Sequence, residues 1–555
     1  MTSAIVPGTV IPGVAAARLD EWIKDNGIVL HPRLHIGASD LGGIGLVFDN
    51  ADGEVNAEDD FEVLRIPAKM GLDYMSLLEV MDAMKLRDGE VEAEIVESQL
   101  VVEVLKLMLP KTETEIIMAY IVAFEILRQV NVNSDYWRDS PLRKFDVYLD
   151  VLTHTATPSY PQIKSSPDPF INKLIASANA VKLEYDLFIG ELAQEYKSLQ
   201  VDKLMPFAKY YQIYQLIKLR SLEIPHASID TDFSKLSLDL DSLKPNESDD
   251  TDFYINVTLV PILDFANHRH NNNAYFDVDL ETSDVVLKLK NDATIDPAKF
   301  EVTISYLPHE LVQHFIQTYG FIPQLTDFQL FELKLPPMDQ VVKDGTLKSK
   351  WMRILPQIQI VGRKDEVYLN FFDNNLPLLF IDDFNYNPNW SDDAISDFRK
   401  YNDFADDDEL DEVEILNVLK HQEECYDVIN GIGPLGITFK GEKVDHLQLV
   451  IRAVAQDDSG YSFDDLIQRT ITFIRDHAKT QLAAPPLVDD DDDDNDNDGF
   501  TQLVSQYQAY QKRLLQRLVD YAGSIDDLIL PEELAHPDWE TNFRSLPREL
   551  VLGDD

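Results

Sequence analysis

Cysteine is almost absent from this sequence. Among 555 residues there is one cysteine, Cys425, and this excludes an internal disulfide. It also excludes the zinc sites that several thiolates build together. A chain without disulfides suits a reducing compartment, so we expect it in the cytoplasm, with the nucleus as a second location.

Positive charge and long apolar runs are scarce as well. Lysine and arginine number 48 against 99 aspartates and glutamates, which gives a formal net charge of -51. A field of this sign repels nucleic acid and attracts basic proteins. No apolar run is long enough to cross a membrane, and the start of the chain, broken by Pro7 and Pro12, has the pattern of neither a signal peptide nor a transit peptide. We therefore expect a basic protein as partner, neither nucleic acid nor membrane, and a monomeric chain.

The sequence predicts no metal site. His309 and His314 bracket Glu310, but their spacing of five places them about 140° apart around a helix. The acidic tract 489–498 imitates the start of a calcium loop, but the twelfth position is Ser505 and not the glutamate that closes the shell. Two alternatives remain: weak calcium binding by the acidic tract, and a metal cluster of His268 and His270 with Asp264.

The apolar pattern predicts a β-rich unit that a helical segment interrupts. Within the helical segment, Thr112 and Glu115 form a predicted capping box. After Leu330 the pattern is largely helical, and it ends in an amphipathic helix over 503–521. Strands are expected at 28–36, 44–48, 61–66, 254–259, 285–289 and 300–306, and helices between about 74 and 219.

The segment 259–275, LVPILDFANHRHNNNAY, joins an apolar run to polar groups. We interpret the run as a buried strand that ends in Asp264, Asn267 and His268 and opens into an asparagine-rich bend. An amide and an imidazole in that place can hold a polar ligand. The structural alternative is a capped strand end with a hydrogen-bonded core histidine.

Polar and glycine motifs recur in a fixed order along the chain. A glycine-rich turn is followed by Arg220, by the Asp264-Asn267-His268 segment, by Tyr306 and by Tyr319-Gly320-Phe321. In this order the chain resembles SET-domain protein-lysine methyltransferases of the class typified by the plant Rubisco large-subunit methyltransferase. Fungal ribosomal-protein lysine methyltransferases are similar. The resemblance covers roughly residues 19 to 324.

The resemblance implies an α+β fold and a domain plan. A β-rich SET domain is split by a helical insert and followed by a mostly helical C-terminal substrate-binding lobe. The expected boundaries are 19–73 for the N-terminal SET part, 74–219 for the insert, 220–325 for the C-terminal SET part with the cofactor and lysine sites, and 326–555 for the helical lobe with its acidic loops.

The resemblance also implies roles for particular residues, with S-adenosylmethionine as cofactor. Arg220 matches the arginine that holds the cofactor's carboxylate, and Asp264 begins the segment in which Asn267 and His268 grip the cofactor. Tyr306 matches the tyrosine nearest the transferred methyl, where it also contacts the cofactor, and Tyr319 matches the aromatic beside the lysine channel. The first cofactor-contacting turn corresponds to Gly43, Ile44, Gly45 and Leu46. The chain departs from the class at Leu219, Leu222 and Leu307.

The implied reaction is a direct in-line methyl transfer to a deprotonated lysine. Free lysine has a pKa of ~10.4, so a narrow aromatic channel has to favour the uncharged amine. The acidic chain suits a basic substrate, and the resemblance places a ribosomal protein first. Two alternatives remain open: a non-catalytic acidic binding protein or chaperone for basic clients, and a histidine-directed methyltransferase of the same class.

Overall fold

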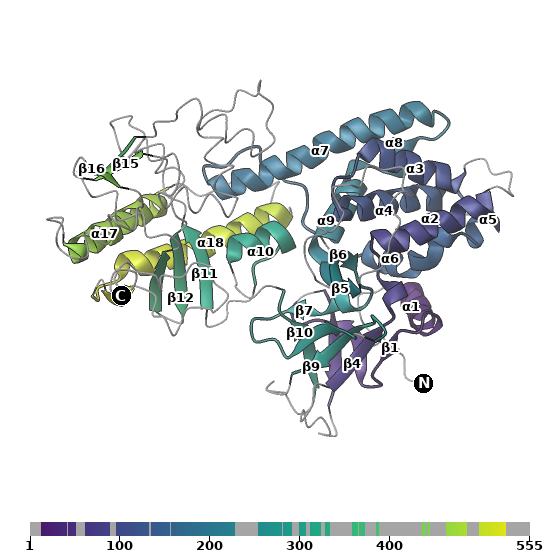
Figure 1. The fold of residues 1–555 in the computed structure, drawn as a ribbon, viewed down its shortest axis with the longest axis horizontal. Helices are drawn as coiled ribbons and strands as arrows, with labels where there is room; N and C mark the ends of the chain where they lie inside the picture. The colour runs from purple at the N-terminus through teal and green to yellow at the C-terminus, as the bar shows by residue number, and fades with distance from the viewer. Residues whose placement is uncertain are drawn as a thin grey trace. The chain divides into compact units, whose positions relative to one another are not determined.

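The computed structural model divides the chain into two compact units (Figure 1). The first contains the described residues up to 306 together with 314–323 and 499–505, and the second contains the remainder. The structure describes residues 13–41, 43–50, 61–88, 96–131, 135–155, 157–227, 253–279, 281–290, 299–306, 311–323, 328–333, 358–363, 366–371, 384–387, 436–439, 442–444, 462–484, 499–524 and 526–528.

Strands from both sides of the helical segment pair with each other in the first unit. One sheet has the order β1-β4-β9-β8 and a second has the order β2-β3-β10-β7, so the predicted β-rich unit closes across the insert. A two-stranded sheet joins β5 to β6. The bounds are β1 Val29–Leu30, β2 Leu34–Ala38, β3 Ile44–Asp49, β4 Phe61–Ile66, β5 Ser221–Ala227, β6 Phe253–Leu259, β7 Asn267–His268, β8 Ala274–Val278, β9 Val285–Leu289 and β10 Lys299–Ile304.

The helical segment lies between β4 and β5. Its central helix is apolar on all sides and buried from Ile116 to Leu127, as expected of a helix with neighbours all round. The predicted capping box is present, since Thr112 Oγ1 accepts from the Glu115 amide at 3.3 Å and Glu115 Oε2 accepts from the Thr112 amide at 3.2 Å. The helices are α2 Tyr74–Asp88, α3 Glu97–Met108, α4 Glu113–Val130, α5 Asp135–Arg138, α6 Asp146–Leu152, α7 Pro169–Glu195, α8 Val201–Leu204 and α9 Phe207–Arg220, preceded by α1 Gly13–Asp25.

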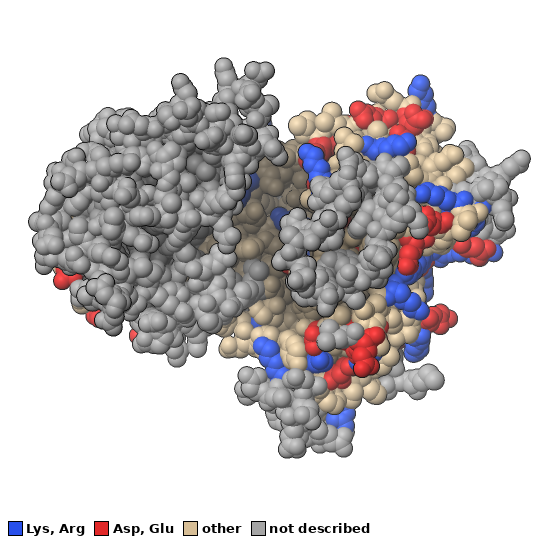
Figure 2. Space-filling view, in the orientation of Figure 1, with Lys and Arg blue, Asp and Glu red and all other residues tan. Residues whose placement is uncertain are grey.

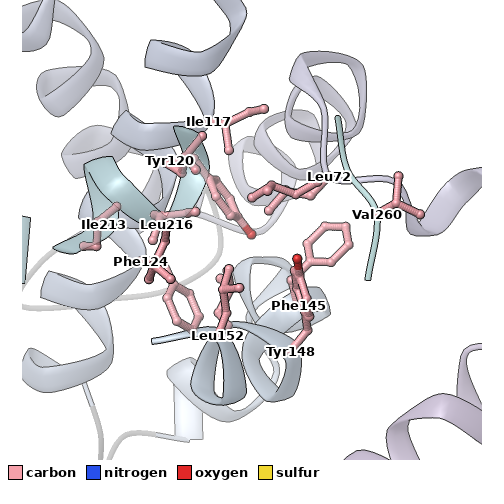
Figure 3. Packing of buried hydrophobic residues seen from close by; sticks show 14 of the residues in the cluster. Leu72, Ile117, Tyr120, Phe124, Phe145, Tyr148, Leu152, Ile213, Leu216 and Val260 are labelled. Carbon is pink, nitrogen blue, oxygen red and sulfur yellow. The ribbon is translucent and has the colours of Figure 1, made fainter. Parts of the chain in front are cut away.

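The core of the first unit is continuous from the helices into the strands. The buried cluster contains Phe124, Leu152 and Leu216 from the helices as well as Leu72 and Val260 beside the end of β6, and Figure 3 labels these five side chains. Burying such side chains contributes about 1.5–3 kcal/mol each. The core therefore holds the segment after β6 rigidly, and that segment contains the predicted site.

The apolar run 259–266 is buried, but it is not a strand. β6 ends at Leu259, Ile262 has a φ of 73°, and a 3₁₀ turn covers Leu263–Phe265 before β7 begins. The strand prediction for this run was wrong. A short apolar run indicates that the segment is buried, but it does not distinguish a strand from another backbone conformation. The positive φ of Ile262 is unusual for a β-branched residue, and no feature of the sequence predicts it.

The second unit mixes strands and helices. β11 Phe328–Leu333, β12 Ile358–Arg363 and β13 Glu366–Phe371 form one antiparallel sheet, and β14 Phe384–Asn387, β15 Gly436–Phe439 and β16 Glu442–Val444 form another. The helices are α17 Phe463–Leu482 and α18 Gly499–Asp520, whose residues from 506 onward belong to this unit. The prediction of a largely helical lobe did not include these strands. Cys425 and the acidic blocks 406–412 and 489–498 lie outside the described residues.

Three further observations concern surface charge, membrane spans and metal sites. On the face drawn in Figure 2, acidic and basic side chains are interspersed where the residues are described. Among the described helices none combines the length and hydropathy of a membrane span. The described residues also contain no group of three or more His, Cys, Asp or Glu side chains arranged to hold a metal ion.

Candidate active site

Strand pairing brings distant parts of the sequence together in the first unit. β10 pairs with β3 on one side, placing Val302 opposite Leu46, and runs parallel to β7 on the other, placing Thr303 opposite Asn267. Tyr306 follows β10 by two residues. The predicted glycine turn, the Asn-His pair and the tyrosine are therefore held by one sheet.

The amide of Asn267 is fixed by two hydrogen bonds. Its Nδ2 donates to the carbonyl oxygen of Ile44 at 3.0 Å and to Glu301 Oε1 at 2.8 Å. These bonds use both amide hydrogens, so the amide oxygen remains as an acceptor. Ile44 thus contributes its carbonyl to hold Asn267, and the side chain of Leu46 is fully buried in the core.

Glu301 is a residue of this site that was not predicted from the sequence. Its Oε1 accepts from Ser39 Oγ at 2.6 Å as well as from Asn267, while its Oε2 is buried without a partner among the described residues. A Cβ at Gly45 would lie 2.5 Å from Oε1, so the glycine makes room for this carboxylate. The signal in the sequence was one acidic residue within an apolar strand.

The turn before β3 depends on Gly43 for its conformation. Gly43 has a φ of +71°, and its carbonyl accepts from the Ser39 amide at 3.1 Å. A Cβ at Gly43 would meet nothing within 4 Å, so the requirement is conformational and not steric. Gly43 is therefore required for its backbone conformation, whereas Gly45 is required for the space that the Glu301 carboxylate occupies.

Arg220 and Asp264 form a buried ion pair. Arg220, the last residue of α9, donates through Nη1 to the Asp264 carbonyl at 2.9 Å and to Oδ2 at 3.4 Å, and Tyr148 Oη donates to Oδ2 at 3.1 Å. Burial raises the pKa of Asp264 to about 6 even though both neighbours lower it. The Arg220 side chain is 20% exposed, and its guanidinium has more donors than Asp264 uses, so donors remain for a further anion beside Asp264.

Tyr306 is held at both ends by the Asn-His segment. Its backbone amide donates to His268 Nδ1 at 3.1 Å, and its hydroxyl donates to the Ala266 carbonyl at 2.9 Å. Burial raises the pKa of Tyr306 well above its ordinary value, so the phenol keeps its proton at neutral pH. Such a phenol orients an amine by hydrogen bonding and does not serve as a base.

An aromatic wall surrounds Tyr306. The rings of Tyr319 and His268 lie 4.8 and 5.4 Å from it, and Phe321 lies at 6.5 Å. Phe315, one turn before Tyr319 on α10 (Val312–Tyr319), packs against His268 with ring centroids 4.6 Å apart and the rings tilted by 46°. Burial also raises the pKa of Tyr319, to about 12. Phe315 and Phe321 were not predicted as site residues, although Phe315 stands at the i, i+4 spacing to Tyr319 that shares a helix face.

The predicted residues form two connected groups within the first unit. One group runs from Gly45 through Asn267 and His268 to Tyr306 and Tyr319, joined by the contacts above. The other is the Arg220–Asp264 pair, whose aspartate lies two residues before Ala266, the acceptor of the Tyr306 hydroxyl. At one end of the first group the Asn267 amide oxygen and Glu301 Oε2 are available as hydrogen-bond acceptors, and at the other end aromatic rings enclose Tyr306. This arrangement suits a polar ligand bound next to a cationic group.

Comparison with known proteins gives the family. The family model described as Ctm1, cytochrome c lysine N-methyltransferase 1, matches residues 21–480. Proteins with that name are 37% identical over 146 residues in Kluyveromyces lactis, 28% over 348 in Eremothecium gossypii and 27% over 268 in Saccharomyces cerevisiae. These matches cover 25%, 58% and 45% of this chain and 29%, 63% and 39% of the relatives, less than two thirds of each relative's length.

Solved structures give a weaker likeness. The SET domain of LSMT bound to lysine and AdoHcy is similar with a TM-score of 0.42 and 13% identity, over 92% of this chain and 91% of that one. Rubisco LSMT bound to AdoMet gives 0.39 and 12%, over 98% and 97%. At these TM-scores the likeness carries no argument about this chain. The names of the three sequence relatives state cytochrome c and not a ribosomal protein.

Proposed function

The chain belongs to the family of cytochrome c lysine N-methyltransferase 1, and from that premise we propose that it transfers a methyl group from S-adenosylmethionine to a lysine of cytochrome c. The observation that carries the proposal is the placement of the Tyr306 hydroxyl, which is bonded to Ala266 beside the anchored amide of Asn267 and enclosed by aromatic rings. A site for a cofactor and a site for an amine thus share one short segment. The ribosomal substrate expected from the sequence gives way to cytochrome c.

The free polar atoms of the site fit the cofactor. S-adenosylmethionine carries donors on its ammonium and adenine, and the Asn267 amide oxygen and the buried Glu301 Oε2 are acceptors without a partner among the described residues. A buried carboxylate oxygen without a donor is costly, and a cationic donor removes that cost. Arg220 would take the cofactor's carboxylate with the donors that Asp264 leaves free.

The chain's own residues supply positioning and desolvation. Bound S-adenosylmethionine supplies a methyl group that its sulfonium has already activated. The Tyr306 hydroxyl donates its proton to the Ala266 carbonyl, so its oxygen would accept a hydrogen bond from the incoming amine and fix the amine's line of approach. The rings of Tyr306, Tyr319 and Phe321 exclude water, which favours the neutral amine over the ammonium.

The charge of the chain supports a basic protein substrate. With 99 acidic against 48 basic residues, the field of the protein attracts a lysine-rich partner over distances of about 10 Å at moderate ionic strength. Its effect is on the rate of encounter more than on the chemical step. Raising the salt concentration should therefore lower kcat/KM for the protein substrate before it lowers kcat.

The test is methyl transfer to a purified cytochrome c. The full chain is incubated with cytochrome c and S-adenosylmethionine carrying a labelled methyl, and the modified side chain is located by fragment mass spectrometry. We expect label on a lysine side chain, and its loss in Asn267→Ala. Label on a histidine would overturn the lysine assignment. Cofactor uptake with label only in another basic protein would overturn the substrate, and absence of saturable cofactor uptake would leave the chaperone alternative.

A further inference from the structure

A cavity in the first unit lies apart from the aromatic wall but shares a segment with it. Its volume is about 90 Å³, and its lining comes from α7, α9, α10 and the first residues of α18. Its lining consists of Lys173, Lys218 and Gly320 together with neutral polar side chains, among them Ser177, Tyr214 and Gln317, and apolar residues. A cavity of this size holds a few water molecules or one small group and excludes a nucleotide or a folded segment.

The cavity is cationic in a strongly acidic chain. Its described lining includes Lys173 and Lys218 and no aspartate or glutamate. Neither lysine forms an ion pair with a described carboxylate. Other lysines of the same helices are neutralised, since Lys182 pairs with Asp186 within α7 and Lys209 of α9 lies 3.9 Å from Glu125 of α4.

Lys218 is held where its charge is unfavourable. It is half-buried, and burial together with the nearby Lys173 lowers its pKa. His314 faces it from α10, and the pKa of that imidazole is lowered by its own burial and by Lys218. Partly buried charges are ordinarily paired, so the arrangement predicts an anion that is supplied from outside the described residues.

Neutral polar groups also line the cavity. The Tyr214 hydroxyl and the Gln317 amide lie beside the two ammonium groups, and Ser177 is hydrogen-bonded to Tyr214. A small oxyanion accepts such bonds around its whole surface, and bonds from charged donors contribute about 1.5–3 kcal/mol each. The donor set therefore suits a carboxylate or a phosphate.

The cavity is linked to the proposed lysine channel along the chain by one short segment. Gly320 lines it with a φ of +69°, and a Cβ there would lie 2.2 Å from Pro158 Cγ, so this corner is closely packed. Gly320 directly follows Tyr319, whose ring lies 4.8 Å from Tyr306. A group bound in the cavity would therefore lie at a fixed distance from the aromatic residues that would receive the target lysine.

We propose that this cavity binds a carboxylate of the protein substrate and so selects which lysine enters the channel. The proposal rests on the proposed function. Two lysines without a described partner would repel a substrate whose surface is uniformly basic, and an acidic side chain on the substrate would remove this repulsion. A substrate with an acidic side chain near its target lysine meets both requirements, and this makes the cavity a specificity site.

A labelling experiment tests the anion site without using activity. The full chain is treated with an amine-reactive reagent at constant ionic strength, with and without acetate or inorganic phosphate, and modification of each lysine is measured by mass spectrometry. Lys203, which is exposed on α8, is the control. We expect acetate to protect Lys218 at least threefold and to leave Lys203 unchanged. Equal labelling of Lys218 with and without either anion would overturn the site.

Kinetics test whether the substrate supplies the anion. Lys218→Met should raise KM for the protein substrate about tenfold, equivalent to about 1.4 kcal/mol, with little change in kcat or cofactor Kd. Lys218→Arg should restore KM, and Lys203→Met should change nothing. Equal losses in kcat and cofactor affinity would show a structural role and overturn the proposal. Protection by phosphate with an unchanged KM in Lys218→Met would assign the cavity to a free anion instead.

The chain's own acidic tract is the remaining competitor. Replacing the aspartates of 489–498 by asparagine should leave the labelling of Lys218 unchanged if the substrate is the source. A rise in labelling would assign the cavity to the tract and overturn the proposal. If the unaltered chain transfers no methyl to any protein, the proposed function fails, while the labelling result still decides whether the cavity binds an anion.

Discussion

Removal of one hydroxyl from Tyr306 should separate binding from catalysis. In Tyr306→Phe the ring stays in the aromatic wall, and only the bond from Oη to the Ala266 carbonyl at 2.9 Å is lost. Such a bond contributes about 0.5–1.5 kcal/mol, so cofactor affinity should fall by less than about tenfold. Turnover should fall by about 100-fold or more, because the group that orients the amine is gone.

Tyr319→Phe is the matched control for this prediction. The Tyr319 hydroxyl reaches the Tyr306 carbonyl at 3.4 Å, which is long for an O–H···O bond, and its ring also remains in the wall. Turnover in Tyr319→Phe should therefore stay within about threefold of the parent. Single-turnover methyl transfer gives the rate, and calorimetry gives the cofactor Kd.

Three results would refute the reasoning. If Tyr306→Phe were as active as the parent, the hydroxyl would have no part in aligning the amine. If both variants lost the same activity, the aromatic wall as a whole, and not the Tyr306 hydroxyl, would set the rate. A loss of cofactor affinity as large as the loss of turnover would place Tyr306 in cofactor binding alone.

Three further changes test the surroundings of the site. Gly45→Ala should lower the unfolding free energy by about 1–3 kcal/mol, because the new Cβ would lie 2.5 Å from Glu301 Oε1. The control Gly190→Ala, on the exposed face of α7, should raise the unfolding free energy by about 0.5–1 kcal/mol. Equal denaturation midpoints for the two variants would contradict this. Glu301→Gln should weaken cofactor binding about fivefold by replacing a charged acceptor of Asn267 with a neutral one, and an unchanged Kd would remove Glu301 from the site. Folding raises the pKa of Asp264 from 3.8 to about 6, so the folded state binds its proton more tightly than the unfolded state does. The unfolding free energy should therefore fall by up to about 3 kcal/mol as the pH rises from about 4 to 6. Asp264→Asn should reduce this fall, and the same dependence of unfolding free energy on pH in parent and variant would disprove it.

Local signals predicted the regular elements of the first unit well. The strand expected at 61–66 matches β4, the strand expected at 44–48 ends one residue later in β3, and the capping box at Thr112 begins α4 as the sequence predicts. Each depends on apolar periodicity or on a cap within four residues. Such features are encoded locally, so a single sequence suffices.

Features that depend on distant partners were not predictable in the same way. Glu301 meets Asn267 across 34 positions and Ser39 across 262, and its one local signal, an acidic residue within an apolar strand, does not name these partners. The bend at Ile262 is imposed by the core around it, against the backbone preference of a β-branched residue. The order of motifs along the sequence was enough to nominate the site residues, whereas the contacts between them became known only from the folded sheet.

Equilibrium binding of S-adenosylmethionine tests the central claim most directly, which is that Asn267 and Tyr306 belong to one cofactor site. Calorimetric titration of the full chain should show saturable binding of one molecule per chain. Asn267→Ala should weaken that binding by at least tenfold, since it removes the anchored amide that bridges Ile44 and Glu301. No saturable binding by the parent, or the same Kd in the variant, would contradict the account.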